Sequence, residues 1–330
     1  MSASAADPHI VLACSSDAGY APYAAAMLHS AIARTPGARF TIHYLQDPDF
    51  PESERERLKQ SLAPFGARAD LRFMTVPDTL VEGLPLFQFM KPGLIRPVMW
   101  YRVFLPQLLP DTPKVLYLDC DTLVTDSLLP LWQTDVAGKA IAAVTNPFWE
   151  GYNEGKPWPT VCGLPKPEDY FNSGVMLMNL DYFRAHGVSR RVVEHGIANA
   201  GWIRFGDQDS LNALLHAART PLHPRYNLMR IIIMTSDSRR VFGHAVVSEA
   251  ITNPAILHFE GTTKPWVDAT QHPYGRAYSR TASQLPWPMR RTPASLLDIE
   301  NFLTRRDWIR LRRLFRRVRS RLQAKQGANT

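Results

Sequence analysis

Residues 114–123 read Lys-Val-Leu-Tyr-Leu-Asp-Cys-Asp-Thr-Leu, an apolar run that ends in two aspartates one residue apart. The run has the length and composition of a buried strand, and side chains at positions i and i+2 of an extended backbone lie on the same side. The carboxylates of Asp119 and Asp121, side by side near an apolar sheet, cannot both stay ionised without a compensating cation. Oxygen ligands suit Mg²⁺ or Mn²⁺, which would in turn bind a diphosphate. The alternative is that one aspartate caps the following turn and the other is solvated.

The segments before this strand alternate between strand-like and helix-like patterns. We expect strands at residues 9–14, 39–45 and 71–76, and helices at residues 20–34, 51–63 and around 98–105. Strands that alternate with helices predict an α/β fold, in which a parallel sheet carries helices on both faces. Because ligands of such sheets bind beyond the carboxyl ends of the strands, acidic residues that follow apolar runs are candidate site residues.

A long loop separates the next two predicted strands. Residues 139–145 and 174–180 are strand-like, whereas the intervening residues 146–167 are rich in Pro, Gly and Trp. A loop of this length in a compact domain is either mobile or functional. Helical patterns follow at residues 181–200 and 207–218.

Six short blocks occur in order along the chain. They are Ile10-Val-Leu-Ala-Cys-Ser-Ser-Asp17 with Tyr20, Tyr101-Arg102, Val115-Leu-Tyr-Leu-Asp-Cys-Asp121, Tyr170-Phe-Asn-Ser-Gly174 with Asn179-Leu180, Asp207-Gln-Asp209, and His258-Phe-Glu-Gly-Thr-Thr-Lys-Pro-Trp266. Through these blocks, residues 9–266 resemble glycosyltransferase family 8, whose retaining enzymes include bacterial lipopolysaccharide galactosyl- and glucosyltransferases and glycogenin. The resemblance implies a GT-A type α/β fold, with a mixed, mostly parallel sheet flanked by helices. We expect this catalytic domain to cover residues 1–285.

His258 ends a strand-like run, and its neutral imidazole is able to complete a metal site with Asp119 and Asp121. It matches the third metal ligand of the family, so the resemblance implies a Mn²⁺ or Mg²⁺ site made of these three residues. A lone histidine is otherwise more often a satisfied surface or core residue.

The resemblance also implies how a UDP-sugar binds at the amino-terminal block. Asp17 and Tyr20 correspond to residues that bind the uridine. The family often shows an asparagine before this tyrosine, which is absent here, so the ribose or phosphate contact of that asparagine is not carried over, whereas Asp17 keeps the uracil contact. Alternatively, Asp17 is the N-cap of the following helix.

The hexose end of the donor is assigned to residues of three other blocks. Arg102 corresponds to an arginine near the donor sugar and phosphate, although a salt bridge that fixes its helix is an ordinary alternative. Asn172, Ser173, Asp207 and Gln208 would surround the transferred sugar and orient its anomeric carbon through hydrogen bonds to the ring hydroxyls. Asp207 would also serve as the N-cap of the helix that it begins.

Gly261 and Lys264 follow on a turn where backbone can approach a phosphate closely. The Lys264 ammonium would neutralise charge that develops on the departing UDP, and the alternative is a surface lysine. Retention of configuration is implied by the family alone. The residue nearest to a nucleophile's position is Gln208, and because an amide is a poor nucleophile, we expect the acceptor hydroxyl to attack on the face from which UDP leaves.

The formal net charge of +8 is carried by the end of the chain. Residues 290–325 hold twelve Lys or Arg and three Asp or Glu, which leaves about −1 for residues 1–289. Leu311, Phe315, Val318 and Leu322 follow Trp308 at helical spacing, and arginines fill most positions between them. Residues 286–330 are therefore predicted to be a basic amphipathic tail that binds an anionic membrane surface. Docking of the apolar stripe onto the catalytic domain is an alternative. Because no nucleic-acid-binding signature occurs elsewhere, we expect no nucleic-acid partner.

The cellular setting is indicated by weaker features. Three scattered cysteines form no CxxC pair, the first eight residues lack the pattern of an export signal, and no apolar run approaches the roughly 20 residues of a membrane-spanning helix. We expect a cytoplasmic protein, peripheral on the inner face of the cytoplasmic membrane.

The sequence therefore predicts a retaining hexosyltransferase. It would transfer galactose or glucose from a UDP-sugar to a glycan or glycolipid acceptor, with lipopolysaccharide core as the preferred acceptor. One alternative is a glycogenin-like or protein-directed glucosyltransferase of the same family. The other is a catalytically inactive, membrane-bound nucleotide- or glycan-binding protein, against which the intact Asp119, Asp121 and His258 set argues.

Overall fold

The computed structural model describes residues 7–85, 97–147, 151–153, 156–261, 264–267, 269 and 272–287. The chain divides into two compact units, Met1–Phe259 with Leu285–Trp287, and Glu260–Gln284 with Pro288–Thr330. From residue 288 on, the predicted basic tail lies outside the described residues, so the predicted domain boundary at residue 285 stays a prediction. Among the described residues, no helix has both the length and the apolar character needed to cross a bilayer.

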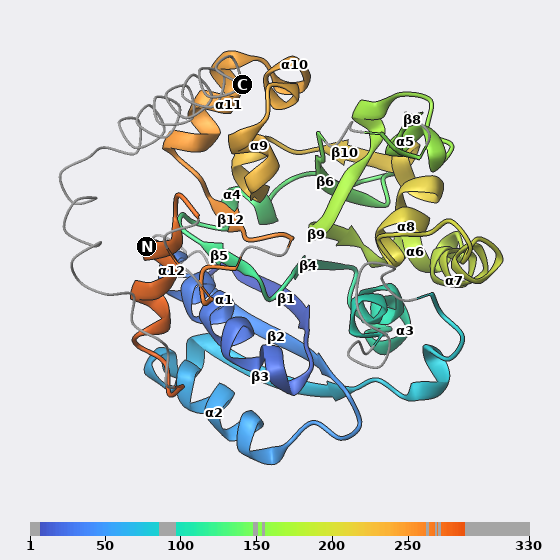
Figure 1. Cartoon of the computed structure of the whole chain (residues 1–330). Helices are drawn as coiled ribbons and strands as arrows, with labels where there is room; N and C mark the ends of the chain where they lie inside the picture. Colours follow the sequence, from blue (N-terminus) through green and yellow to red (C-terminus); the bar gives the residue numbers. More distant parts are fainter. Residues whose placement is uncertain are drawn as a thin grey trace, which may run out of the picture. The chain divides into compact units, whose positions relative to one another are not determined.

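A seven-stranded sheet forms the centre of the first unit (Figure 1). Its strands, in spatial order, are β10 (Arg219–Pro221), β6 (Ile141–Thr145), β9 (Phe171–Asn179), β4 (Lys114–Leu118), β1 (His9–Ser15), β2 (Arg39–Gln46) and β3 (Ala69–Thr75). Strands β4, β1, β2 and β3 run parallel, as do β6 and β10, whereas β9 is antiparallel to both of its neighbours. The predicted mixed, mostly parallel sheet is confirmed.

Helices and short strands connect the strands of this sheet. The α-helices of the first unit are α1 (Ala21–Arg34), α2 (Glu52–Leu62), α3 (Leu105–Leu108), α4 (Leu129–Trp132), α5 (Trp158–Val161), α6 (Leu180–Ala185), α7 (Val188–Ala198), α8 (Asp207–Leu215), α9 (Arg230–Met234), α10 (Asp237–Phe242) and α11 (His244–Thr252). The 3-10 helices are η1 (Ala18–Tyr20), η2 (Ala63–Arg68), η3 (Asp78–Leu80), η4 (Pro97–Phe104), η5 (Pro167–Asp169), η6 (His216–Ala218) and η7 (Pro224–Asn227). Two further strands, β7 (Gly151–Asn153) and β8 (Lys156–Pro157), form an antiparallel ribbon.

Three segments differ from the sequence prediction. The helix expected over residues 181–200 is two helices, α6 and α7, because Gly187 between them adopts a left-handed conformation with φ of 58°. The helix expected around residues 98–105 is mostly the 3-10 helix η4. The expected loop 146–167 contains β7, β8 and α5.

The direction of β9 places its first residues beside the end of β4. Leu118, the last residue of β4, pairs with Val175, and the Asp119 N–H donates to the Gly174 carbonyl at 2.7 Å. Residues 172–174 therefore lie at the same edge of the sheet as the carboxyl end of β4. The strand predicted over residues 174–180 begins three residues earlier than expected, so Asn172 and Ser173 belong to β9.

A smaller sheet lies beyond the two aspartates. It consists of β11 (Leu228–Met229), β12 (Ile256–His258) and β5 (Thr122–Val124). Strand β12 runs antiparallel to β5, and His258 pairs with Thr122. Helix α1 holds this sheet, because the Ser30 hydroxyl accepts a hydrogen bond from the Val124 N–H at 3.0 Å. The register brings His258 to the turn that contains Asp119 and Asp121.

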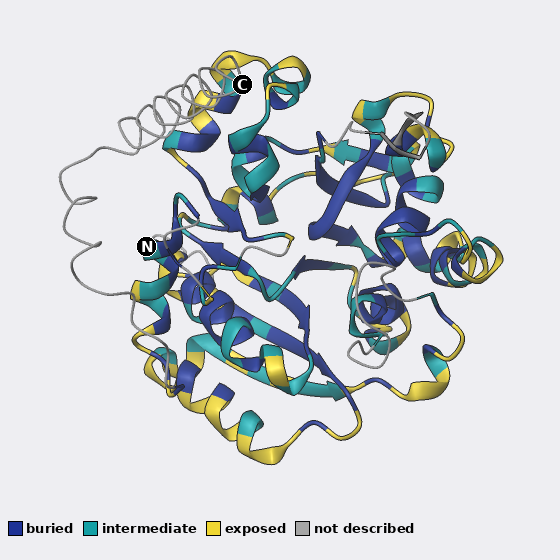
Figure 2. Cartoon of the chain, in the orientation of Figure 1, coloured by how far each residue is buried: buried dark blue, intermediate teal, exposed yellow. Residues whose placement is uncertain are grey.

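The inner strands β1, β2, β4, β6 and β9 are mostly buried on both faces, which explains why they read as continuous apolar runs, whereas the edge strand β3 is partly exposed (Figure 2). On one face, Val115 and Tyr117 of β4 pack in a cluster with residues of η4 and α6–α8, among them Trp100 and Phe183. This packing holds η4, the segment that carries Arg102, against the sheet.

The second unit contains one helix among its described residues, α12 (Gly275–Ala282). The rings of Trp266 and Tyr278 contact each other, with centroids 5.3 Å apart. Gly275 lies so close to the Ala269 carbonyl that a Cβ would come within 2.0 Å of the oxygen. The helix therefore begins at a position where only glycine fits.

Candidate active site

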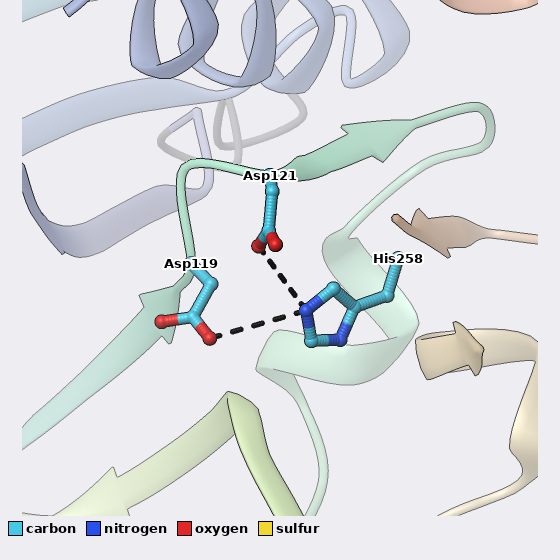
Figure 3. Close-up of side chains that lie close together, drawn as sticks. All are labelled: Asp119, Asp121 and His258. Atoms are coloured by element: carbon cyan, nitrogen blue, oxygen red, sulfur yellow. Dashed lines mark ion pairs between the residues drawn. The ribbon is translucent and has the colours of Figure 1, made fainter. Parts of the chain in front are cut away.

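Asp119, Asp121 and His258 gather where β4 and β12 end (Figure 3). One ligand atom from each lies within 4.8 Å of the other two. The His258 Nε2 atom is 3.1 Å from Asp121 Oδ1 and 3.9 Å from Asp119 Oδ2. The imidazole is buried, whereas the carboxylates are partly accessible. The structure thus brings together the three residues that the sequence predicts as metal ligands.

Backbone hydrogen bonds set this geometry. The N–H and the hydroxyl of Thr122 both donate to the Asp119 carbonyl, at 3.1 and 2.8 Å. The two aspartates therefore lie in a turn, not in the extended backbone that the sequence suggests. The Phe259 N–H donates to the Asp121 carbonyl at 2.9 Å, which attaches the end of β12 to the same turn.

The ligand atoms suit a divalent cation. His258 Nδ1 is 2.9 Å from the amide oxygen of Asn227. Because an amide oxygen only accepts, Nδ1 carries the hydrogen and Nε2 directs its lone pair toward the aspartates. Two carboxylates and a neutral imidazole are ligands that Mn²⁺ accepts, and the carboxylates alone suit Mg²⁺. Asn227 belongs to no sequence block, and sequence reasoning missed it.

Gly174 leaves the space that two of the ligands occupy. A Cβ at this position would come within 2.4 Å of His258 Cε1 and 2.6 Å of Asp119 Oδ2. Contacts this short do not occur in proteins, so any side chain here displaces the ligands. The glycine of the Phe-Asn-Ser-Gly block is therefore a requirement of the metal triad.

Arg102 links the triad to the predicted sugar site. Its buried guanidinium pairs with Asp119 Oδ1 at 3.0 Å and with Asp207 Oδ2 at 2.9 Å. It also donates to the Ser173 carbonyl at 2.7 Å and lies over the Tyr117 ring at 4.5 Å from the centroid. The salt bridge that the sequence left as an alternative exists, while the contact of Arg102 with a donor stays a prediction.

Asp207 is buried at the start of α8. Burial raises the pKa of its carboxyl to about 7, against the opposing effect of Arg102, and the Asp119 carboxylate raises it further. The N-cap of α8 is Gly206 and not Asp207, which corrects the capping role that the sequence suggested. Gly206 has a φ of 56°, and a Cβ there would come within 2.3 Å of the Met99 sulfur.

The amide of Gln208 contacts β9 and the residue before it. Its Oε1 accepts from the Ser173 N–H at 3.0 Å and from Asn172 Nδ2 at 3.2 Å. Its Nε2 donates to the Tyr170 hydroxyl at 2.9 Å. The four residues predicted to surround the sugar therefore come together, because Arg102 and Gln208 connect β9 to α8.

Asp209, the third residue of the Asp-Gln-Asp block, has a role that sequence reasoning missed. Its fully buried carboxylate accepts from Trp158 Nε1 at 2.9 Å and from the Tyr170 hydroxyl at 2.6 Å. It also accepts from the backbone N–H groups of Arg204 and Phe205, at 2.8 and 2.9 Å. A carboxylate with so many donors fixes α5 and the segment before α8 around itself.

The predicted uridine and phosphate contacts stay predictions. Asp17 follows β1, and its carboxylate accepts from the Tyr20 N–H at 2.9 Å as the N-cap of η1, which is the capping alternative. Gly261 and Lys264 belong to the second unit. Gly261 has a φ of 79°, and the Lys264 ammonium lies 5.5 Å from the centre of the Trp266 ring.

Comparison with protein families and sequences places the chain among glycosyltransferases. Residues 10–270 match the model of the family described as Glycosyl transferase family 8. The General stress protein A of Bacillus subtilis (strain 168) is 29% identical over 293 residues, which cover 87% of this chain and 96% of that protein. The lipopolysaccharide 1,2-glucosyltransferase of Escherichia coli (strain K12) is 28% identical over 194 residues, 57% of this chain and 55% of that enzyme. This chain therefore spans about half the length of the Escherichia coli enzyme.

A solved structure shares the fold. The galactosyltransferase LgtC, in complex with donor and acceptor sugar analogs, superposes with a TM-score of 0.72 at 26% identity, covering 84% of this chain and 97% of LgtC. An active-site mutant of LgtC, with a glutamine replaced by glutamate, superposes equally well. Together with the mixed sheet, this similarity assigns the GT-A fold.

Substitution of Gly174 tests the steric requirement at the triad. In the Gly174→Ala variant, we expect Mn²⁺ affinity, measured by calorimetric titration, to fall by about 10-fold or more, because the methyl group displaces His258 and Asp119. Gly201→Ala is the matched control, because a Cβ at Gly201 meets nothing within 4 Å. Equal Mn²⁺ affinity in both variants would refute the requirement.

The pKa of Asp207 predicts a pH-dependent difference in stability. Its carboxyl titrates at 3.8 in an ordinary environment and at about 7 in the folded chain, so the folded state loses stability as the pH rises between these values. In metal-free protein, Asp207→Asn removes this loss. We expect its free energy of unfolding, relative to wild type, to rise by about 2 kcal/mol between pH 5 and pH 8 in urea titrations. Asp111→Asn, at an exposed aspartate, controls for the loss of one charge; a difference between Asp207→Asn and wild type that does not change with pH would contradict the raised pKa.

Proposed function

Because this chain belongs to glycosyl transferase family 8, we propose that it is a metal-dependent, retaining hexosyltransferase that moves galactose or glucose from a UDP-sugar to a glycan or glycolipid acceptor. The observation that carries the proposal is the position of the buried guanidinium of Arg102, which pairs with both Asp119 and Asp207. It thereby links the triad Asp119, Asp121 and His258 to the start of α8, where Asp207 and Gln208 lie. A triad of metal ligands adjoining a cluster of hydrogen-bonding side chains matches the two ends of a nucleotide-sugar.

The metal of the proposal is Mn²⁺ or Mg²⁺, held by Asp119, Asp121 and His258. When bound, it would neutralise negative charge on the diphosphate as the sugar leaves. Arg102 orients Asp119 through their ion pair, and Gly174 leaves room for the ligands. We further propose that Gly261 and Lys264 contact the phosphates.

The sugar of the donor is proposed to bind against β9 and α8. Asn172, Ser173, Asp207 and Gln208 supply amide, hydroxyl and carboxylate groups for the ring hydroxyls, and Arg102 contributes a cation near the phosphate. The uridine is assigned to Asp17 and Tyr20, just past β1, with Asp17 at the uracil. LgtC, which is similar to this chain, was solved with donor and acceptor sugar analogs, and this supports a donor site of the same kind.

Retention of configuration is proposed to follow a same-face substitution. The Gln208 amide accepts and donates hydrogen bonds to its neighbours and is a poor nucleophile. The Asp207 carboxylate pairs with Arg102, and that of Asp209 is enclosed by donors. These contacts favour attack by the acceptor hydroxyl itself. A covalent sugar adduct on Gln208 or Asp207, detected by mass spectrometry, would exclude this mechanism.

The preferred acceptor is lipopolysaccharide core, presented at a membrane. The similarity to the lipopolysaccharide glucosyltransferase of Escherichia coli supports it. The basic tail, residues 286–330, would hold the enzyme on the anionic inner face of the cytoplasmic membrane, where both UDP-sugar and lipid-linked acceptor are accessible.

Release of UDP tests the proposed activity. With a panel of UDP-sugars, we expect Mn²⁺-dependent turnover of UDP-galactose or UDP-glucose, and we expect Asp121→Ala to lower it by at least about 100-fold, because a ligand of the leaving-group cation is lost. Asp111→Ala, at an exposed aspartate, is the matched control and should keep wild-type turnover.

The alternatives make different predictions for the same assay. An inactive binding protein shows no UDP release from any donor. A glycogenin-like enzyme modifies itself, so radiolabelled sugar appears on the protein without added acceptor. Absence of both UDP binding and UDP release in the wild type would refute the transferase.

The tail is tested separately by co-sedimentation with vesicles. Each basic residue near an anionic surface contributes about 1 kcal/mol, so replacing Arg312, Arg313 and Arg316 with Glu should weaken binding to phosphatidylglycerol vesicles by about 100-fold or more. The matched control replaces Arg34, Arg39 and Arg191, three exposed arginines of the first unit. Equal loss in both triple variants would show that overall charge, and not the tail, binds the membrane.

A further inference from the structure

Asn227 lies between the metal triad and the sugar site, at the end of η7 and directly before β11. Its side chain is fully buried. The amide oxygen faces His258 Nδ1 at 2.9 Å, and the amide nitrogen faces Asn172 Oδ1 at 2.8 Å. We propose that Asn227 is a positioning residue, which locks His258 in the metal-binding tautomer and joins that ligand to the amides of the sugar site. The proposal rests on the metal site of the proposed function.

The orientation of each amide in this chain of contacts is set by backbone donors. The Gly174 N–H, which can only donate, points to Asn172 Oδ1 at 2.9 Å. The Ser173 N–H likewise points to Gln208 Oε1 at 3.0 Å. Asn172 therefore presents its oxygen to Asn227 and its nitrogen to Gln208, because the two ends of an amide have opposite roles.

The tautomer of His258 follows from these fixed orientations. Asn172 Oδ1 requires a donor, so Asn227 must turn its nitrogen toward Asn172 and its oxygen toward His258. The oxygen in turn requires a hydrogen on His258 Nδ1. The Nε2 lone pair is then left for the side of the ring that faces Asp121 and Asp119, at 3.1 and 3.9 Å. A histidine that ligates a metal commonly donates its second N–H to an acceptor in this way.

The same series of hydrogen bonds continues into the sugar site, and the direction of donation stays the same. Asn172 donates to Gln208 Oε1, and Gln208 Nε2 donates to the Tyr170 hydroxyl. That hydroxyl donates to Asp209 Oδ1 at 2.6 Å. Every link donates away from His258, and the last acceptor is a carboxylate. Hydrogen bonds aligned head to tail polarise one another. The carboxylate of Asp209 at the end of the series therefore strengthens the hydrogen bond that the His258 N–H donates to Asn227.

Burial makes Asn227 hard to replace. Asn227 is fully buried and His258 is 1% exposed, so water has little access to their hydrogen bond. Loss of the Asn227 oxygen leaves a buried imidazole nitrogen without an acceptor, and loss of its nitrogen leaves Asn172 Oδ1 with one donor fewer. The ring is then free to place its hydrogen on Nε2, where it blocks metal binding.

Two substitutions test the two contacts of Asn227, with His258 and with Asn172, separately. Asn227→Leu keeps the approximate shape but removes both hydrogen bonds, and we expect Mn²⁺ affinity without donor, measured by calorimetric titration, to fall by about 10-fold or more. Asn227→Asp keeps an acceptor for His258 and removes the donor to Asn172. We expect it to retain Mn²⁺ affinity within a few-fold while kcat falls or the KM for the UDP-sugar rises.

Asn212→Leu is the matched control for a lost buried amide. Asn212 is also fully buried, and it bonds the backbone of Phe171 without contact to His258. We expect a loss of thermal stability comparable with that of Asn227→Leu and unchanged Mn²⁺ affinity. Unchanged Mn²⁺ affinity in Asn227→Leu, or an equal loss in Asn212→Leu, would overturn the proposal.

The tautomer is also measurable without any substitution. Long-range proton–nitrogen correlation spectra of the metal-free wild type should show His258 with its hydrogen on Nδ1, and a hydrogen on Nε2 would refute the proposal even if Asn227→Leu does not fold. Failure of the wild type to bind Mn²⁺ at all would instead refute the proposed function, so the two failures are distinguishable.

Discussion

The guanidinium of Arg102 is the only cation that the structure, in the part of the chain it describes, places between the partly accessible carboxylate of Asp119 and the buried carboxyl group of Asp207. Two acidic groups thus share one arginine, which leaves an excess of negative charge when both are ionised. An excess of this kind near an apolar sheet has to be relieved by protonation or by a cation. Burial, with the Asp119 carboxylate as a further cause, raises the pKa of Asp207 and so favours the first route, and a divalent ion at the triad would supply the second. The charge balance of the site would thus favour a bound cation, in addition to the contribution of each ligand.

Strand β9 connects this group of charged residues to the predicted sugar site. Because it runs antiparallel between β4 and β6, its first residues meet the carboxyl end of β4, where the aspartates lie. A parallel strand would have carried Asn172 and Ser173 to the opposite edge of the sheet. Gly174 then leaves room for the ligands on one side, while Asn172 and Ser173 reach Gln208 on the other. Three consecutive residues of β9 therefore adjoin both the metal triad and the proposed sugar site.

The central strands could be predicted from sequence because both of their faces are buried: residues 114–118 form β4 as expected, and β1 and β2 differ from expectation by a residue at one end. Strands β5 and β11 have two or three residues, too few for a recognisable pattern. The strand-like run that ends at His258 is β12, but its pattern does not indicate which strand it pairs with, so the register that brings His258 to the aspartates is visible only in the structure. The metal and sugar residues were named through motif resemblance. Asn227 and Asp209 were not assigned roles, because their contacts join segments far apart in sequence and leave no local pattern.

The small sheet that positions His258 also determines when the three predicted metal ligands come together during synthesis. Its central strand, β12, lies near the end of the first unit, whereas Asp119 and Asp121 leave the ribosome much earlier. Contacts between segments so distant in sequence form late in folding, after the cost of closing the intervening loop has been met. A nascent chain that has exposed β4 but not β12 carries the two aspartates without the imidazole. Acquisition of full affinity for the proposed metal would therefore mark the completed domain, and a truncated product of translation would lack it.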